Sequence, residues 1–119
     1  MLDDIVTKIG SLRLRSATEA AMQDHIATVL PEGFHREFRL NDKDRIDFLA
    51  GDVGIECKID GTQARLMMQC ERYLQSPHLA SLIVVIGKAR LGIGFPSEVR
   101  VQGVVKQVRV ISTWKNAFL

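Results

Sequence analysis

The sequence predicts a single α/β domain with a mixed sheet of four or five strands and helices on both sides. Its 119 residues, 46% hydrophobic and 25% charged, suit one ordinary globular domain spanning residues 1–119. Segments with helical spacing of apolar residues are interleaved with strand-like segments. The most apolar segment, residues 79–87, is a continuous run rather than an alternating one, which is typical of a central strand covered on both faces. These patterns favour a layered α/β architecture.

Three segments have helical character. Residues 2–9 predict a short helix, and residues 17–30 predict a second one, with apolar side chains at helical spacing. Ser16 and Glu19 form the Ser-x-x-Glu pattern of a capping box, so we expect Ser16 to be the N-cap of the second helix. Residues 61–75 predict a third helix.

The remaining segments have the composition of strands. They are residues 34–40, 45–50, 53–60, 79–87, 99–101 and 107–112. Gly51 and Asp52 separate two of these segments and are typical of the two-residue loop of a tight hairpin of type II′ or I′. The sequence therefore predicts a hairpin at this point.

The register of this hairpin brings charged side chains together. If Gly51 and Asp52 form the loop, Asp47 lies opposite Glu56, with Cβ atoms about 4.5–5.5 Å apart. Because side chains alternate along a strand, Lys58 is expected on the same face as Glu56. The opposite face would be an apolar layer of Ile46, Phe48, Ile55 and Cys57.

Two carboxylates that face each other across a sheet repel, unless a positive charge lies between them. A divalent cation such as Mg²⁺ or Mn²⁺ satisfies this requirement, since Mg²⁺ binds one or two carboxylates together with water and phosphate oxygens. The Lys58 ammonium could then hold a phosphate oxygen or orient an attacking water. The alternative is a solvated strand face with an ordinary Lys58–Glu56 pair.

These residues resemble the signature of the PD-(D/E)XK nucleases, an acid on one strand and Glu-x-Lys on the next. Here the signature reads Ile46-Asp47 and Glu56-Cys57-Lys58, with Ile46 in place of the usual proline. The resemblance spans residues 16–112 and implies a three-layer restriction-endonuclease-like sandwich. It further implies Mg²⁺- or Mn²⁺-dependent hydrolysis of DNA phosphodiester bonds, with catalytic Asp47, Glu56 and Lys58. The implied metal ligands are Asp47, Glu56 and the backbone carbonyl of Cys57.

Three further residues match positions around this signature. Glu19 matches a helical glutamate that some members place beside the site as a catalytic and metal-binding residue, although its place in the capping box also accounts for it. Gln69 and Tyr73 form a Gln-x-x-x-Tyr motif like that of lambda exonuclease and RecB-type nucleases. The resemblance implies a supporting catalytic role for both, while an amphipathic helix surface is the alternative.

The net charge of +2 permits binding of nucleic acid without demanding it. DNA is the expected partner, RNA stays open, and exonuclease and endonuclease action are not distinguished. Five arginines could contact phosphates, and the sequence does not choose among them: Arg36, Arg39, Arg45, Arg65 and Arg72.

Two other functional hypotheses stay open. One is a catalytically silent nucleic-acid-binding module or subunit of a larger complex. The other is a dimeric junction-resolving endonuclease, since a chain of this length leaves little room for a separate recognition domain, and substrate binding would have to come from the rim of the site or from a second subunit. No apolar run is long enough to span a bilayer, and the N-terminus carries Asp3 and Asp4, so we expect a cytoplasmic protein with no membrane partner.

Overall fold

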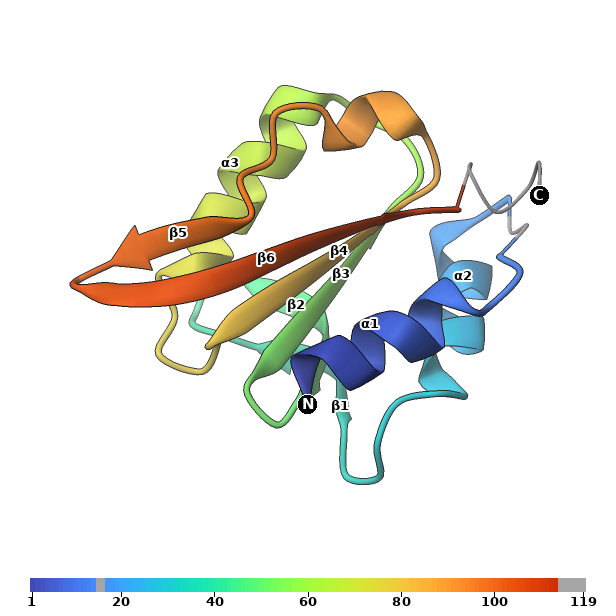
Figure 1. Ribbon diagram of the computed structural model, residues 1–119, viewed down its shortest axis with the longest axis horizontal. Helices are drawn as coiled ribbons and strands as arrows, with labels where there is room; N and C mark the ends of the chain where they lie inside the picture. The colour runs from blue at the N-terminus through green and yellow to red at the C-terminus, as the bar shows by residue number, and fades with distance from the viewer. Residues whose placement is uncertain (15–16, 114–119) are drawn as a thin grey trace.

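The computed structural model describes residues 1–14 and 17–113, with a mixed sheet at the centre (Figure 1). Its helices are α1 (Leu2–Gly10), α2 (Glu19–Ala27) and α3 (Gln63–Leu74), with a 3₁₀ turn, η1 (Ala89–Gly92). Its strands are β1 (His35–Arg39), β2 (Arg45–Ala50), β3 (Val53–Lys58), β4 (Ser81–Ile86), β5 (Glu98–Val101) and β6 (Val104–Ser112). The predicted α/β class is confirmed for this part of the chain, with six strands rather than the four or five expected.

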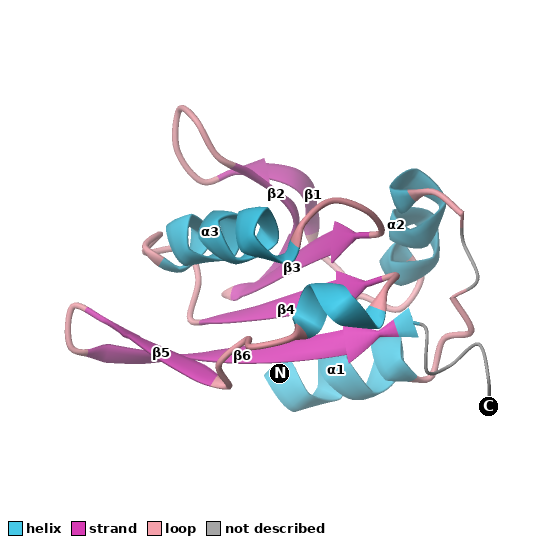
Figure 2. Cartoon of the chain, turned by 90° about the horizontal axis from the view of Figure 1, so that it is seen from above, coloured by secondary structure: helices cyan, strands magenta, loops and turns pink. Residues whose placement is uncertain are grey.

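The strands lie in the order β1-β2-β3-β4-β6-β5 (Figure 2). The first three pair antiparallel, β3, β4 and β6 pair parallel, and β5 returns antiparallel to β6. The β5–β6 hairpin turns at Gln102 and Gly103, both of which have positive φ (50° and 80°), as a type I′ turn requires. Because of this turn, β6 begins at Val104, three residues before residue 107, where the predicted strand begins.

The start of α2 corrects one prediction. Thr18, not Ser16, is the N-cap: its backbone is extended, and its hydroxyl oxygen accepts the Ala21 N–H at 3.1 Å. Ser16 lies outside the described residues. Glu19 is therefore the first residue of the helix and not the third, so the expected capping box is wrong. The Glu19 carboxylate does not take part in a capping box and can make another contact.

Both faces of the sheet are covered (Figure 1). One apolar cluster lies between the sheet and α3, with Leu66, Cys70, Tyr73 and Leu74 as the buried residues of that helix. A second cluster lies on the other face and includes the buried residues of α1 and α2, which are Ile5, Ile9, Met22 and Ile26. Among the described residues, no helix has the length and apolar character needed to cross a membrane.

Candidate functional site

The β2–β3 hairpin has the predicted register next to its turn. Ala50 pairs with Val53, Leu49 with Gly54 and Phe48 with Ile55. Gly51 has a φ of 60°, which opens the two-residue turn. The backbone ladder ends at Phe48 and Ile55, so the next two residues along the strands, Asp47 and Glu56, begin an irregular part of the sheet.

The irregular part begins with a change of face in β2. Ile46 packs in the α3-side cluster, whereas Phe48 packs in the cluster of α1 and α2. A Cβ added to Gly54 would lie 2.6 Å from Ile46 Cδ1, so Ile46 lies on the face that Gly54 shares with Glu56. The predicted apolar layer is thus wrong for Ile46, while Phe48, Ile55 and Cys57 do share one cluster.

Strand β1 changes face at the same level. The Arg36 guanidinium lies over the Phe48 ring, 5.6 Å from its centroid, whereas Phe38 packs against the α3-side cluster. Between them Glu37 has a φ of 55°, the left-handed region that a residue other than glycine rarely adopts. The register places Glu37 across from Asp47. Two neighbouring strands therefore reverse their alternation together, at Glu37 and Asp47.

At this reversal the two acidic side chains replace backbone carbonyls as hydrogen-bond acceptors. The Asp47 N–H donates to Glu56 Oε1 at 3.1 Å, and the Cys57 N–H donates to Asp47 Oδ2 at 2.8 Å. The N–H and C=O of one strand residue point to the same side, so the Cys57 carbonyl also faces β2. The Asp47 and Glu56 carboxylates therefore lie together where the ladder stops, and the Cys57 carbonyl is directed towards the same strand.

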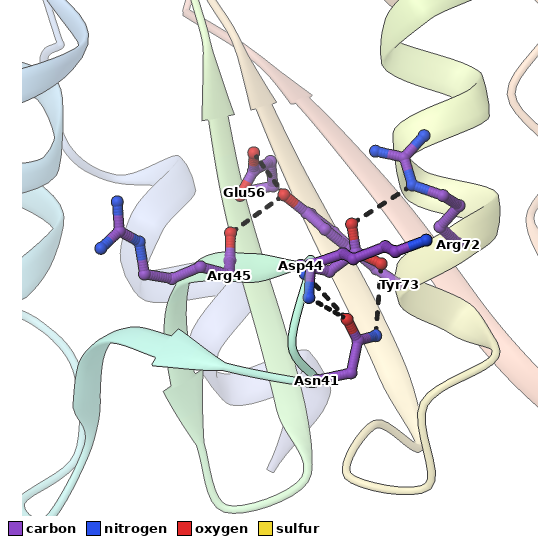
Figure 3. Close-up of polar contacts among 7 residues, drawn as sticks. Asn41, Asp44, Arg45, Glu56, Arg72 and Tyr73 are labelled. Atoms are coloured by element: carbon purple, nitrogen blue, oxygen red, sulfur yellow. Dashed lines mark hydrogen bonds and ion pairs between the residues drawn. The ribbon is translucent and has the colours of Figure 1, made fainter.

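Tyr73 holds Glu56 from the α3 side. Its hydroxyl lies 3.3 Å from Glu56 Oε2 and 3.1 Å from the Arg45 carbonyl oxygen, and it can donate to either (Figure 3). Both side chains are almost fully enclosed, with Glu56 6% and Tyr73 2% exposed. The tyrosine of the Gln-x-x-x-Tyr motif therefore contacts the glutamate of the Glu-x-Lys motif.

The enclosure changes the acidity of both carboxyl groups. Burial, with the nearby Asp47 charge as a second cause, raises the pKa of Glu56 from 4.5 to about 9. Burial also raises the pKa of Asp47, although the Cys57 N–H acts in the opposite direction. Without a cation, burial thus favours the protonated form of Glu56 and disfavours two full charges on the pair.

Glu19 reaches the border of this site from the other side of the sheet. Its Oε2 atom accepts the Ile59 N–H at 3.4 Å, just beyond the end of β3. Its charge is near enough to raise the pKa values of Asp47 and Cys57. The described residues show no hydrogen bond between Glu19 and either member of the Asp47–Glu56 pair.

Lys58 and Gln69 line one open pocket on the α3 side. The same pocket is lined by Arg65, Leu66, Met68 and Arg72. The Lys58 side chain passes Gly61, where an added Cβ would lie 3.3 Å from Lys58 Cε. The sequence analysis named Arg65 and Arg72 only among five possible phosphate contacts and did not place them beside Lys58. Their positions, four residues before and three residues after Gln69 on a helix, indicate that they share its face.

The donor set is small but fits a hard divalent cation. Within residues 1–14 and 17–113, no group of three or more His, Cys, Asp or Glu side chains is arranged to hold a metal. The set that the resemblance implies has only two carboxylates and the Cys57 carbonyl, and these are adjacent. Each carboxylate keeps lone pairs beyond those used by the backbone N–H groups. Water and phosphate oxygens can complete such a site, as is usual for Mg²⁺.

Comparisons of the chain with protein-family models, curated proteins and solved structures gave no match. The functional assignment therefore depends on the residues of the site themselves.

Proposed function

We propose that this protein is a Mg²⁺- or Mn²⁺-dependent nuclease of the PD-(D/E)XK type that hydrolyses DNA phosphodiester bonds. The observation that supports it most strongly is the contact between the half-buried Asp47 and the buried Glu56 at the point where the β2–β3 ladder stops, with Lys58 two residues after Glu56 along β3. Helices on both faces of the sheet agree with the three-layer restriction-endonuclease-like sandwich, which is part of the proposal.

The acidic pair would hold the cation. Asp47, Glu56 and the Cys57 carbonyl are the proposed ligands, and Glu56 would lose its proton when the cation binds. The bound cation would lower the pKa of a coordinated water and offset charge on the phosphoryl group. The Asp47 N–H and the Tyr73 hydroxyl fix the two oxygens of Glu56, so this carboxylate needs little rearrangement.

Lys58 would act on the substrate. In the described part of the chain its ammonium group makes no hydrogen bond or ion pair, so it is available to a phosphate oxygen or an attacking water. The Gln69 side chain lines the same pocket and can hydrogen-bond to a phosphate. Glu19 would support the site through Ile59, by holding the end of β3.

A cleavage assay tests this proposal. Labelled linear, nicked, single-stranded and four-way-junction DNA, and one RNA strand, are incubated with Mg²⁺, Mn²⁺ or EDTA. The wild type is compared with Glu56→Gln and Lys58→Ala, and with Asp52→Asn as a control in the exposed hairpin turn. We expect metal-dependent products that fall by about a hundredfold or more in both site variants and stay unchanged in the control.

Two outcomes would contradict the proposal. Cleavage that survives in both site variants would place the chemistry elsewhere, and DNA binding without cleavage by the wild type would favour a silent binding module. A preference for the junction, together with a dimer mass by light scattering, would narrow the function to a junction-resolving endonuclease.

A further inference from the structure

The outer face of α3 presents a row of side chains beside the site. Arg65, Met68, Gln69 and Arg72 follow the spacing i, i+3, i+4 and i+7, which places them on one side of a helix. All four line the same pocket as Lys58. We call these four residues the α3 basic face. Arg65 and Arg72 lie seven residues apart, or about 10 Å along the helix axis.

Arg65 differs from two of the other arginines that the sequence offered, because those two already have partners within the protein. Arg36 is occupied by Asp24, with an Nη1–Oδ1 distance of 2.9 Å, and Arg39 donates to the Asp42 carbonyl at 3.1 Å. The Arg65 guanidinium makes no hydrogen bond or ion pair with the described residues. In Figure 3 the Arg45 guanidinium points away from α3. Within the described residues, the pocket thus holds an arginine and a lysine whose charged groups have no partner, Arg65 and Lys58.

Arg72 is held in position by a short chain of contacts. Its Nε donates to Asp44 Oδ1 at 3.2 Å, and Asn41 Nδ2 donates to Asp44 Oδ2 at 3.3 Å. Asn41 Oδ1 also accepts the Asp44 N–H at 2.8 Å, which fixes the turn that carries the aspartate. Figure 3 shows the two terminal nitrogens of Arg72 directed away from Asp44. Arg72 is therefore oriented in advance while two of its nitrogens remain available for a ligand.

Met68 adds an apolar surface between the two arginines. It is 60% exposed, one of the largest exposures of any apolar side chain in the described residues. A cationic groove with an interposed apolar surface suits a nucleic-acid strand, because the cations bind phosphates and the apolar surface packs against an unpaired base.

We infer that the α3 basic face binds a nucleic-acid strand with unpaired bases. Arg65 and Arg72 contact backbone phosphates, and Met68 packs against a base between them. The inference rests on the proposed function for the identity of the ligand. It assigns this surface to recognition of the strand beside the cleaved bond and requires no turnover.

Binding in EDTA tests the inference apart from catalysis. A fluorescent single-stranded oligonucleotide and its duplex are titrated between about 50 and 200 mM salt, where phosphate contacts dominate the salt dependence. Arg65→Ala and Arg72→Ala are compared with Arg100→Ala, which removes the same charge from β5, where the guanidinium donates to the Gly103 carbonyl. Thermal unfolding verifies that each variant is folded.

For the single strand, we expect Arg65→Ala and Arg72→Ala each to reduce the slope of log affinity against log salt by about 0.7, and Arg100→Ala to leave it unchanged. Met68→Ala should weaken single-strand binding about fivefold and duplex binding less than twofold. Arginine variants that bind like Arg100→Ala would overturn the inference, and so would equal effects of Met68→Ala on both ligands.

The same variants are then assayed with Mg²⁺ or Mn²⁺. If the wild type cuts DNA but both arginine variants keep full affinity, the α3 basic face is wrong and the nuclease proposal stands. If the wild type binds through these arginines and cuts nothing, the binding face stands and the nuclease proposal fails.

Discussion

The β2–β3 hairpin has two halves that differ in their hydrogen bonding. The regular half pairs residues 48–50 with residues 53–55, and the open half contains Asp47, Glu56 and Cys57. Beside the turn, Phe48, Leu49 and Ala50 pair regularly with β3, and their side chains are buried. One residue further, Asp47 accepts a hydrogen bond from Cys57 and donates one to Glu56, so side-chain oxygens replace the backbone ladder. The regular half supplies packing. The open half holds the half-buried Asp47 and the buried Glu56, and it faces Glu37, whose backbone is strained; such features concentrate at functional sites.

The largest effect on stability is expected in the regular half. Phe48 is fully buried and packs edge-on against Phe34, with ring centroids 5.8 Å apart. We expect Phe48→Ala to lower the free energy of unfolding by about 3–5 kcal/mol, because it opens a cavity between the sheet and the helices. Urea denaturation measures this loss, which should be the same at acidic and alkaline pH. A loss below about 1 kcal/mol would contradict the packing role.

The second effect belongs to the open half and depends on pH. Because Glu56 has a pKa of about 9 in the folded protein and 4.5 ordinarily, the folded state binds the extra proton between these values. The contribution of Glu56 to stability should therefore be fully present below about pH 4.5 and be lost as pH rises towards 9, in metal-free buffer. Glu56→Gln, which imitates the protonated acid, should remove this slope and stabilise the protein by about 2 kcal/mol near pH 8.

Urea denaturation across this pH range measures the slope, and Asp52→Asn provides a matched acid-to-amide control. If stability changed with pH equally in the wild type and in Glu56→Gln, the folded protein would not raise the pKa of Glu56. The two halves of the hairpin would then not differ in their dependence on pH.

A smaller effect should follow from removing one hydroxyl. Tyr73→Phe keeps the buried ring but loses the hydrogen bonds to Glu56 and to the Arg45 carbonyl, at a cost of about 1 kcal/mol. The tyrosine hydroxyl lowers the pKa of Glu56, so its loss should raise that pKa further and extend the fall in stability to higher pH. The same denaturation series detects the shift. A pH profile identical to that of the wild type would exclude a link between Tyr73 and Glu56.

The smallest effect is expected at the hairpin turn. Asp52 is exposed, and among the described residues its carboxylate has no hydrogen-bond or ion-pair partner. Asp52→Asn should therefore change the free energy of unfolding by less than about 0.5 kcal/mol. A larger change would show that the turn, and not only the paired strands, determines the stability of the regular half.

Much of the hairpin could be predicted from local sequence rules. Gly51 and Asp52 set the turn, and the register then placed Asp47 next to Glu56, as the structure shows. The Gln-x-x-x-Tyr motif also identified Tyr73, which contacts Glu56 in the structure, while its supporting catalytic role stays a prediction. These results follow from the fixed geometry of a two-residue turn and from the regular repeat of a helix.

Other features depend on the tertiary structure. Strict alternation of side chains predicted Ile46 on the same face of the sheet as Phe48. The reversal at Glu37 and Asp47 places Ile46 on the other face, and no turn residue in the sequence marks that reversal. The cap of α2 was misplaced because Ser16 and Thr18 are both good N-cap residues and the backbone geometry decides between them.

Contacts between residues far apart in the sequence could not be predicted either. Arg72 and Asp44 are 28 residues apart, and only the fold shows that one holds the other. The same is true of Glu19 and Ile59, which are 40 residues apart. Sequence patterns identified Arg72 and Glu19 as candidates, but their partners depend on how the helices pack on the sheet.

Calorimetric titration of Mg²⁺ or Mn²⁺ into the protein near neutral pH tests the central claim most directly. Wild type and Asp47→Asn are compared in two buffers of different ionisation enthalpy. The account predicts that the wild type binds the cation and releases up to one proton, because Glu56 is protonated beforehand, and that Asp47→Asn loses this binding. Absence of binding by the wild type, or binding that Asp47→Asn leaves intact, would contradict a cation site at the open half of the hairpin.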